Sequence, residues 1–242
     1  MNDTFTKLHI KPKVVTLVPF TSDEPSRIMA WEAVQIWWRN NVGLAIFVGE
    51  SDPSAFNMSL ARNRAANKAD DWDVAVILDA DTVISPNQVK KGILLALHTG
   101  AVVYPFAERW ELNKEGTRLF IANPKSNWQQ HAKRHAYEHF GGCIIVTRDL
   151  WDKVRGFDPG FVGWGHEDGA FLAACTILSG KQCRRVAGKV FHLDHNPSPI
   201  KNPRHPQYIA NRKRMMLYTQ ATHQPNAQEL LGKLRDETIG IV

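Results

Sequence analysis

The sequence has few of the features that mark secreted, membrane-spanning or disulfide-stapled proteins. It contains only three cysteines, Cys143, Cys175 and Cys183, without a CxxC pair, which argues against a disulfide scaffold and for a reducing compartment. The opening stretch Met1 to Lys13 is polar and lacks the apolar core of a signal peptide. No apolar run approaches the roughly 18 residues that a membrane span requires. These absences predict a cytoplasmic protein without a signal peptide.

The composition is that of an ordinary globular chain with a basic surface. The 242 residues are 43% hydrophobic and 22% charged, so the chain can bury a sizeable core without a disulfide or a structural metal. A net charge of +6 attracts phosphates, whether on a nucleotide, a nucleic acid or an anionic lipid. A solvated charged surface explains the same charge without any such partner. The basic run Arg212 to Arg214 is open to the same two interpretations.

Short apolar runs alternate with helix-like segments over much of the chain. We expect strands at 14–20, 44–48, 74–78, 101–106, 143–147 and 189–193, and helices at 26–40, 57–69, 85–100, 167–178, 207–219 and 227–237. Residues 108–139 are more polar and less regular, and 196–207 form a proline-rich basic loop. The alternation predicts an α/β fold, a mostly parallel sheet flanked by helices in a single domain.

The pair Asp79-Ala80-Asp81 directly follows the apolar run Val74 to Leu78. Ligands of open parallel sheets bind at the carboxyl ends of strands, and two carboxylates in one turn suit a hard cation such as Mg²⁺ or Mn²⁺. An aspartate that caps a helix or stabilises a turn gives the same pattern. The position after a buried strand favours the metal-binding interpretation.

Two further segments carry polar groups of the kind that active sites use. In Gly163-Trp164-Gly165-His166-Glu167-Asp168, an aromatic side chain that can stack on a sugar precedes two acids, which could also simply cap a helix. In His192-Leu193-Asp194-His195, the histidines follow a strand and could supply the remaining metal ligands, although histidine pairs are often structural.

A second histidine cluster is a weaker candidate. His131, His135 and His139 are spaced by four, so they would share a face if this segment were a helix. The segment also contains Lys133 and Arg134, and no cysteine lies at metal-binding spacing. A solvated surface is the better interpretation of these three histidines.

Together these segments resemble the GT-A glycosyltransferases, above all the β-1,4-galactosyltransferase family, with kinship to polypeptide N-acetylgalactosaminyltransferases and family-2 glycosyltransferases. The matching segments, spread over residues 13–212, are Leu17-Val18-Pro19-Phe20, Ala61-Arg62-Asn63-Arg64, Asp79-Ala80-Asp81, Phe140-Gly141-Gly142, Trp151, Gly156-Phe157, Gly163 to Asp168, His192 to His195 and Lys201-Asn202-Pro203. The resemblance implies a GT-A (Rossmann-like) catalytic domain over 1–212. Its donor-binding part spans about 13–106, its acceptor and metal part about 140–212, and a helical tail follows at 213–242.

The resemblance also implies roles for single residues. It places Asp168 as the general base, Glu167 as its acidic neighbour, and Mn²⁺ (or Mg²⁺) on Asp81 and His195, with Asp79 and His192 as further candidates. The residues expected at the nucleotide-sugar donor are Pro19, Phe20, Thr21, Arg62, Asp79, Ala80, Asp81, Gly142 and Trp164. The basic loop 196–207 would close over the donor.

Some departures from the family pattern bear on the substrate. His166 stands at a family glycine and Gly169 at a third family acid, next to the residues that distinguish the sugars. The family's disulfide cysteines and membrane stem are absent, which fits a microbial or viral cytoplasmic protein. The expected reaction is an inverting transfer from a UDP-sugar to an acceptor hydroxyl. A saccharide, a glycolipid, a protein side chain and a hydroxylated DNA base all remain open as the acceptor.

Two other classes of protein share part of this pattern. A nucleotidyltransferase also combines a parallel sheet with metal-binding acids, but normally has a basic glycine-rich loop after its first strand. Here that position is the acidic, glycine-free stretch Pro19 to Glu24. A non-catalytic carbohydrate- or nucleic-acid-binding module would explain the basic charge and the eight tryptophans, but would leave the acid and histidine clusters without a role.

Overall fold

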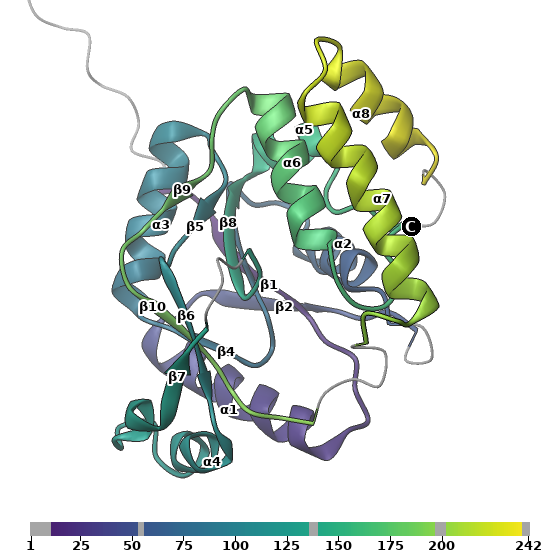
Figure 1. Ribbon diagram of the computed structural model, residues 1–242. Coiled ribbons are helices and arrows are strands. Elements are labelled where there is room, and N and C mark those ends of the chain that lie inside the picture. Colours follow the sequence, from purple (N-terminus) through teal and green to yellow (C-terminus); the bar gives the residue numbers. More distant parts are fainter. Residues whose placement is uncertain (1–10, 53–55, 136–139, 197–201, 239–242) are drawn as a thin grey trace, which may run out of the picture.

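The computed structural model describes residues 11–52, 56–135, 140–196 and 202–238 and contains a central six-stranded sheet (Figure 1). The strand order is β2-β1-β3-β8-β5-β9. The strands are β1 (Val14–Pro19), β2 (Ala45–Gly49), β3 (Val74–Leu78), β5 (Val103–Tyr104), β8 (Cys143–Thr147) and β9 (Arg184–Arg185). The first three run parallel to one another, whereas β8 is antiparallel to both β3 and β5. The predicted α/β fold with a largely parallel sheet is confirmed.

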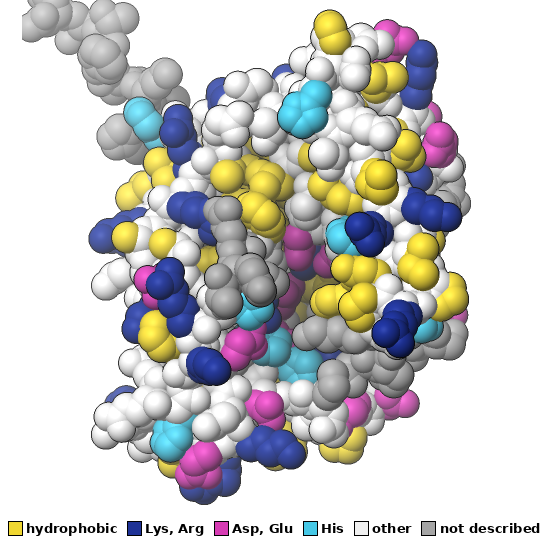
Figure 2. Space-filling view, in the orientation of Figure 1, with side chains coloured by type: hydrophobic (Ala, Val, Ile, Leu, Met, Phe, Trp, Pro, Cys, Tyr) yellow, Lys and Arg dark blue, Asp and Glu magenta, His cyan; other side chains and the backbone are white. Residues whose placement is uncertain are grey.

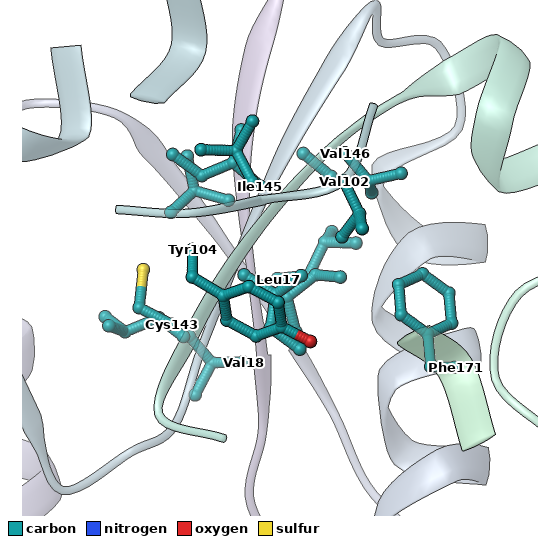
Figure 3. Close-up of a cluster of buried hydrophobic side chains, with 14 of the residues drawn as sticks. Leu17, Val18, Val102, Tyr104, Cys143, Ile145, Val146 and Phe171 are labelled. Carbon is teal, nitrogen blue, oxygen red and sulfur yellow. The ribbon is translucent and has the colours of Figure 1, made fainter. Parts of the chain in front are cut away.

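The core lies on both faces of this sheet. All five residues of β3 are buried, as expected of a strand between two helical layers. Figure 3 shows Leu17 and Val18 of β1 in one buried cluster with Tyr104 of β5 and with Cys143 and Ile145 of β8. The apolar run 101–106 is also buried, although only Val103–Tyr104 of it pairs as a strand.

Helices cover the two faces of the sheet. They are α1 (Pro25–Asn41), α2 (Met58–Ala69), α3 (Pro86–Thr99), α5 (Arg148–Val154) and α6 (Glu167–Ser179). Figure 1 shows α1 and α3 on one side and α2 and α6 on the other. Right-handed crossovers explain why α1 and α2 lie on opposite faces, because β1 to β2 and β2 to β3 run in opposite directions across the sheet.

A second, four-stranded sheet lies beside the first and supplies part of the site. Its order is β4-β10-β6-β7, formed by β4 (Thr82–Ile84), β6 (Glu108–Leu112), β7 (Ala132–Arg134) and β10 (Lys189–His192). The segment 108–139, expected to be irregular, therefore contains two strands, α4 (Lys114–Ala122) and a 3₁₀ helix (Trp128–His131). His131 ends that 3₁₀ helix and His135 follows β7, so the two do not share a helix face, and His139 lies outside the described residues.

Two C-terminal helices complete the structure. They are α7 (Pro206–Thr222) and α8 (Ala227–Asp236), which pack on α6 and on each other. The division expected between residues 212 and 213 falls inside α7. Residues 197–201 of the expected basic loop lie outside the described residues. Within the described chain, the helices are all too short or too polar to span a bilayer.

Candidate active site

The turn after β3 lies at the carboxyl ends of the parallel strands. The Asp79 backbone N–H donates to the Gly142 carbonyl over 2.9 Å, and the Thr82 N–H donates to the Asp79 carbonyl over 3.1 Å. This tight turn leads directly from the central sheet into β4 of the second sheet. Its two acids therefore lie between the sheets, and Figure 2 shows acidic and histidine side chains gathered in a hollow of this face.

Asp81 faces both histidines of the His192 to His195 segment. Its Oδ2 lies 3.0 Å from His195 Nε2, and its Oδ1 lies 3.5 Å from His192 Nε2. The pairing of β4 with β10 explains this, since His192 lies opposite Thr82 and the Leu193 N–H donates to the Asp81 carbonyl over 2.8 Å. One ligand atom from each of the three side chains lies within 4.8 Å of the others.

The donor set of this group fits a divalent cation. A carboxylate oxygen and two imidazole nitrogens, gathered within 4.8 Å, suit Mn²⁺ and related ions. Burial alone would raise the pKa of Asp81, but the adjacent His192 and His195 hold it well below its usual value. Burial likewise opposes protonation of His192, yet Asp81 and Glu111 raise its pKa to about 9. Asp79, the other acid of the turn, lies outside this group and pairs with Arg62 instead.

The acidic start of α6 reaches the same turn through one arginine. Arg62 of α2 bonds Asp168 Oδ1 at 2.6 Å and Asp79 Oδ1 at 3.0 Å, and Glu167 lies 3.8 Å away. The Arg62 side chain is only 1% exposed and its guanidinium lies 4.5 Å from the centre of the Phe157 ring. Arg62, expected at the donor, is thus a buried side chain that holds Asp79 and Asp168 together.

Three carboxylates around one guanidinium leave an excess of negative charge. Burial, together with the charges of Glu167 and Asp79, raises the pKa of Asp168 to about 8 against the opposing effect of Arg62. Burial also raises the pKa of Glu167, and Arg62 opposes this shift. Asp168 keeps 20% of its side chain exposed, so it can reach a bound molecule. A carboxyl group with such a pKa can accept a proton near neutral pH.

The loop before α6 carries Trp164 in an unusual backbone conformation. Gly163, Gly165 and His166 all have positive φ, at 80°, 100° and 76°. Glycine adopts this region freely, whereas a histidine there must be held by its surroundings. Trp164 is 36% exposed and stacks on Tyr208 of α7, with ring centroids 5.4 Å apart. A half-exposed indole beside Asp168 offers an apolar face to a sugar ring.

A pocket adjoins the turn on the side of β1. It is lined by predicted donor residues, Pro19, Phe20, Thr21, Asp79, Ala80 and Asp81, and also by Arg27, Phe56 and Met58. Gly142 lies next to it through its bond to Asp79. Sequence reasoning missed Arg27, which lies in the first turns of α1, and Glu111, which contacts His192 from the segment expected to be irregular. Neither residue belongs to a recognisable sequence motif, because only tertiary contacts bring the two side chains to the site.

Comparison with known families agrees with this geometry. Residues 118–196 match the model of a family described as the N-terminal domain of galactosyltransferase. The predicted resemblance to the galactosyltransferases is confirmed. The matched segment includes Gly163 to Asp168 and both histidines of the metal group, while Asp79 and Asp81 precede it. No curated protein matches the sequence.

Solved structures share the fold. The catalytic domain of Drosophila β1,4-galactosyltransferase 7, in complex with xylobiose, superposes with a TM-score of 0.59 at 20% identity, covering 83% of this chain and 79% of that one. A glucosyl-3-phosphoglycerate synthase from Mycobacterium tuberculosis, with Mn²⁺, UDP-glucose and phosphoglyceric acid, gives 0.49 at 13% identity, covering 88% and 80%. The first likeness confirms the predicted GT-A fold, and the second is too weak to add to it. The family segment and the fold agree with the predicted class of enzyme, a glycosyltransferase.

Proposed function

We propose that this protein is a metal-dependent glycosyltransferase that moves a sugar from a UDP-sugar to an acceptor hydroxyl with inversion at the anomeric carbon. The observation that supports it most is the convergence of three distant segments on one cleft. Asp81 contacts His195, while Asp79 of the same turn shares Arg62 with Asp168 at the start of α6. A binding module needs no such arrangement of acids, histidines and a buried arginine.

Asp168 is the proposed general base. Its carboxylate takes the proton of the acceptor hydroxyl as that oxygen attacks the anomeric carbon, and the sugar–phosphate bond breaks on the opposite face. Arg62 fixes the carboxylate through a 2.6 Å bond, and the partial burial that raises its pKa strengthens it as a base. Glu167 lies 3.8 Å from Arg62 and adds negative charge near Asp168, and its side chain is less exposed than that of Asp168, at 11% against 20%, so it is less suited to take the proton.

The residues fitted to the cation are Asp81, His192 and His195. When bound there, a divalent ion supplies the positive charge that a diphosphate leaving group needs. The chain's own residues then orient the donor. The pocket of Pro19 to Thr21 adjoins the turn, and Arg27 adds a cation to its lining. Trp164 provides a flat surface for the sugars on the side of Asp168.

The test is the release of UDP from a panel of UDP-sugars with Mn²⁺ present, with candidate acceptors analysed by mass spectrometry. Asp81→Ala and Asp168→Asn should each lower the rate of transfer about 10²-fold or more, because one removes a metal ligand and the other the base. Asp149→Asn is the matched control, since Asp149 also lies in a helix first turn but is exposed and remote from the cleft. Full activity in Asp81→Ala or Asp168→Asn would refute the role of that residue.

A further inference from the structure

We propose that Glu111 is a positioning residue of the metal site, which holds the His192 ring so that Nε2 faces the cation. This inference rests on the metal site of the proposed function and adds a residue that lies outside the motifs of the sequence. Glu111 belongs to β6, far along the chain from both Asp81 and His192. Its role follows from the register of the second sheet.

The strand ladder puts three groups in one row. β10 lies between β4 and β6, so His192 is opposite Thr82 on one side and Glu111 on the other. The two ring nitrogens divide between these neighbours. His192 Nδ1 lies 2.9 Å from Glu111 Oε2, and Nε2 lies 3.5 Å from Asp81 Oδ1. The ring is therefore held at both nitrogens.

Glu111 is itself fixed by a second contact. Arg109 Nε donates to Glu111 Oε1 over 2.7 Å, so the two carboxylate oxygens have separate partners. The Arg109 side chain is largely buried, whereas Glu111 is 35% exposed. A carboxylate held in this way cannot easily turn from the histidine, and its position is set by β6 independently of the loop that carries His195.

The contact between Glu111 and His192 Nδ1 determines which ring nitrogen is free to bind a metal. A neutral ring has one N–H, and a carboxylate at Nδ1 keeps that proton there and leaves the Nε2 lone pair for a metal. The negative charge also makes Nε2 a better ligand. His195 has the same arrangement with a backbone acceptor, because its Nδ1 lies 2.9 Å from the Asn196 carbonyl oxygen and its Nε2 faces Asp81. Both histidines thus present the same nitrogen to the same carboxylate.

The test is calorimetric titration of the full chain with Mn²⁺ alone, without nucleotide. Glu111→Ala should weaken Mn²⁺ binding about 10- to 100-fold, because the His192 ring is then free to turn or change tautomer. Glu111→Gln keeps an acceptor oxygen but loses the negative charge. Its Mn²⁺ affinity should therefore lie between those of the wild type and Glu111→Ala. Glu108→Ala is the matched control on the same strand. Its carboxylate accepts from the Trp110 indole, away from His192, so Mn²⁺ affinity should not change.

The outcomes separate this inference from the proposed function. If the wild type binds no Mn²⁺, the metal site itself is wrong and Glu111 has nothing to position. If the wild type binds Mn²⁺ and loses it in Asp81→Ala, but a folded Glu111→Ala binds as tightly as the wild type, the role of Glu111 is overturned. Should Glu111→Ala fail to fold, Glu111→Gln decides. A loss of about threefold or more supports the role, and wild-type affinity overturns it.

Discussion

The two walls of the cleft are built in different ways. The metal wall follows from strand pairing, since β4, β10 and β6 place Thr82, His192 and Glu111 in one row of the second sheet, and Asp81 directly precedes β4. The proposed acceptor wall, the segment 156–166 that carries Trp164, contains a single isolated bridge, between Gly163 and Asn57. Side chains of α2, α7 and α8 hold it instead. Strand pairing fixes the residues of the metal wall through backbone hydrogen bonds, whereas the position of segment 156–166 depends on a few individual side chains.

The tethers of the acceptor wall are largely buried. Asp158 Oδ2 accepts from Arg214 over 2.6 Å and from the Tyr218 hydroxyl over 2.7 Å. The Asn211 amide lies 3.0 and 3.1 Å from the carbonyls of Val162 and Gly165, on either side of Trp164. These helices lie beyond the segment 118–196 that matches the family, so a part of the chain outside that match positions the loop.

Arg62 joins the two walls, and its loss should have the largest effect. Arg62→Met removes the guanidinium shared by Asp79 and Asp168 and leaves buried carboxylates without a cation. We expect the free energy of unfolding at pH 7 to fall by about 3–5 kcal/mol, measured by urea denaturation. Arg118→Met is the control, because that arginine forms an exposed helix-surface pair with Glu115 and its replacement should leave the free energy of unfolding nearly unchanged. Equal losses in the two variants would contradict the bridging role.

Asp158→Asn should destabilise the acceptor wall without changing the metal wall. The change removes a buried charge from Arg214 and Tyr218, so the free energy of unfolding should fall by about 2–3 kcal/mol. The Mn²⁺ affinity of the folded variant should equal that of the wild type, because no strand of the second sheet is touched. A folded variant with clearly weaker Mn²⁺ binding would show that the two walls are coupled.

Asn211→Ala tests one tether of the Trp164 loop. The loss of the amide donor should cost about 1–2 kcal/mol in thermal or urea unfolding. Steady-state kinetics should show a higher KM for the acceptor with little change in Mn²⁺ affinity, since Trp164 is proposed to contact the sugars and not the cation. Gln220→Ala, at an exposed position of the same helix, is the control. An unchanged acceptor KM in Asn211→Ala would contradict the role of α7 in positioning the Trp164 loop.

The pH dependence should carry the smallest of these effects. The pKa of Asp168, raised by burial to about 8, predicts that kcat/KM rises with pH between 6 and 9, because the base acts unprotonated. The sign for stability is opposite. A carboxyl whose folded pKa is raised stabilises the fold fully below about pH 4 and loses that contribution as pH rises through about 8. In Asp168→Asn, the melting temperature should depend less on pH than in the wild type. A wild-type kcat/KM that falls from pH 6 to 8 would contradict the role of Asp168 as the base.

Local patterns were sufficient for one part of the site and insufficient for the other. The apolar run Val74 to Leu78 ends at Asp79, so the buried strand and its terminal acids were visible in the sequence. His192 and His195 follow a second strand and could be placed by resemblance. Strand register is a long-range property, however, and nothing near Glu111 indicates that it pairs with His192. Segment 108–139 reads as irregular because its strands form a small, partly exposed sheet with no continuous apolar run.

Burial was the other property that sequence reasoning could not supply. Arg62 was expected at the donor because the stretch Ala61 to Arg64 resembles the family helix that comes before the metal-binding turn. In the fold, α2 packs against β1 and β2, and Arg62 lies under Asp79 and Asp168 with 1% of its side chain exposed. Three carboxylates gathered from two segments make that burial possible, and their convergence depends on tertiary structure.

The most direct measurement of the central claim is UDP binding by calorimetry with and without Mn²⁺, in the wild type and in Asp81→Ala. The account predicts that UDP binds the wild type far more tightly when Mn²⁺ is present, and that Asp81→Ala loses this dependence. Equal UDP affinity in Mn²⁺ and in EDTA, or an Asp81→Ala variant that keeps the wild-type dependence, would contradict a metal-assisted donor site in this cleft.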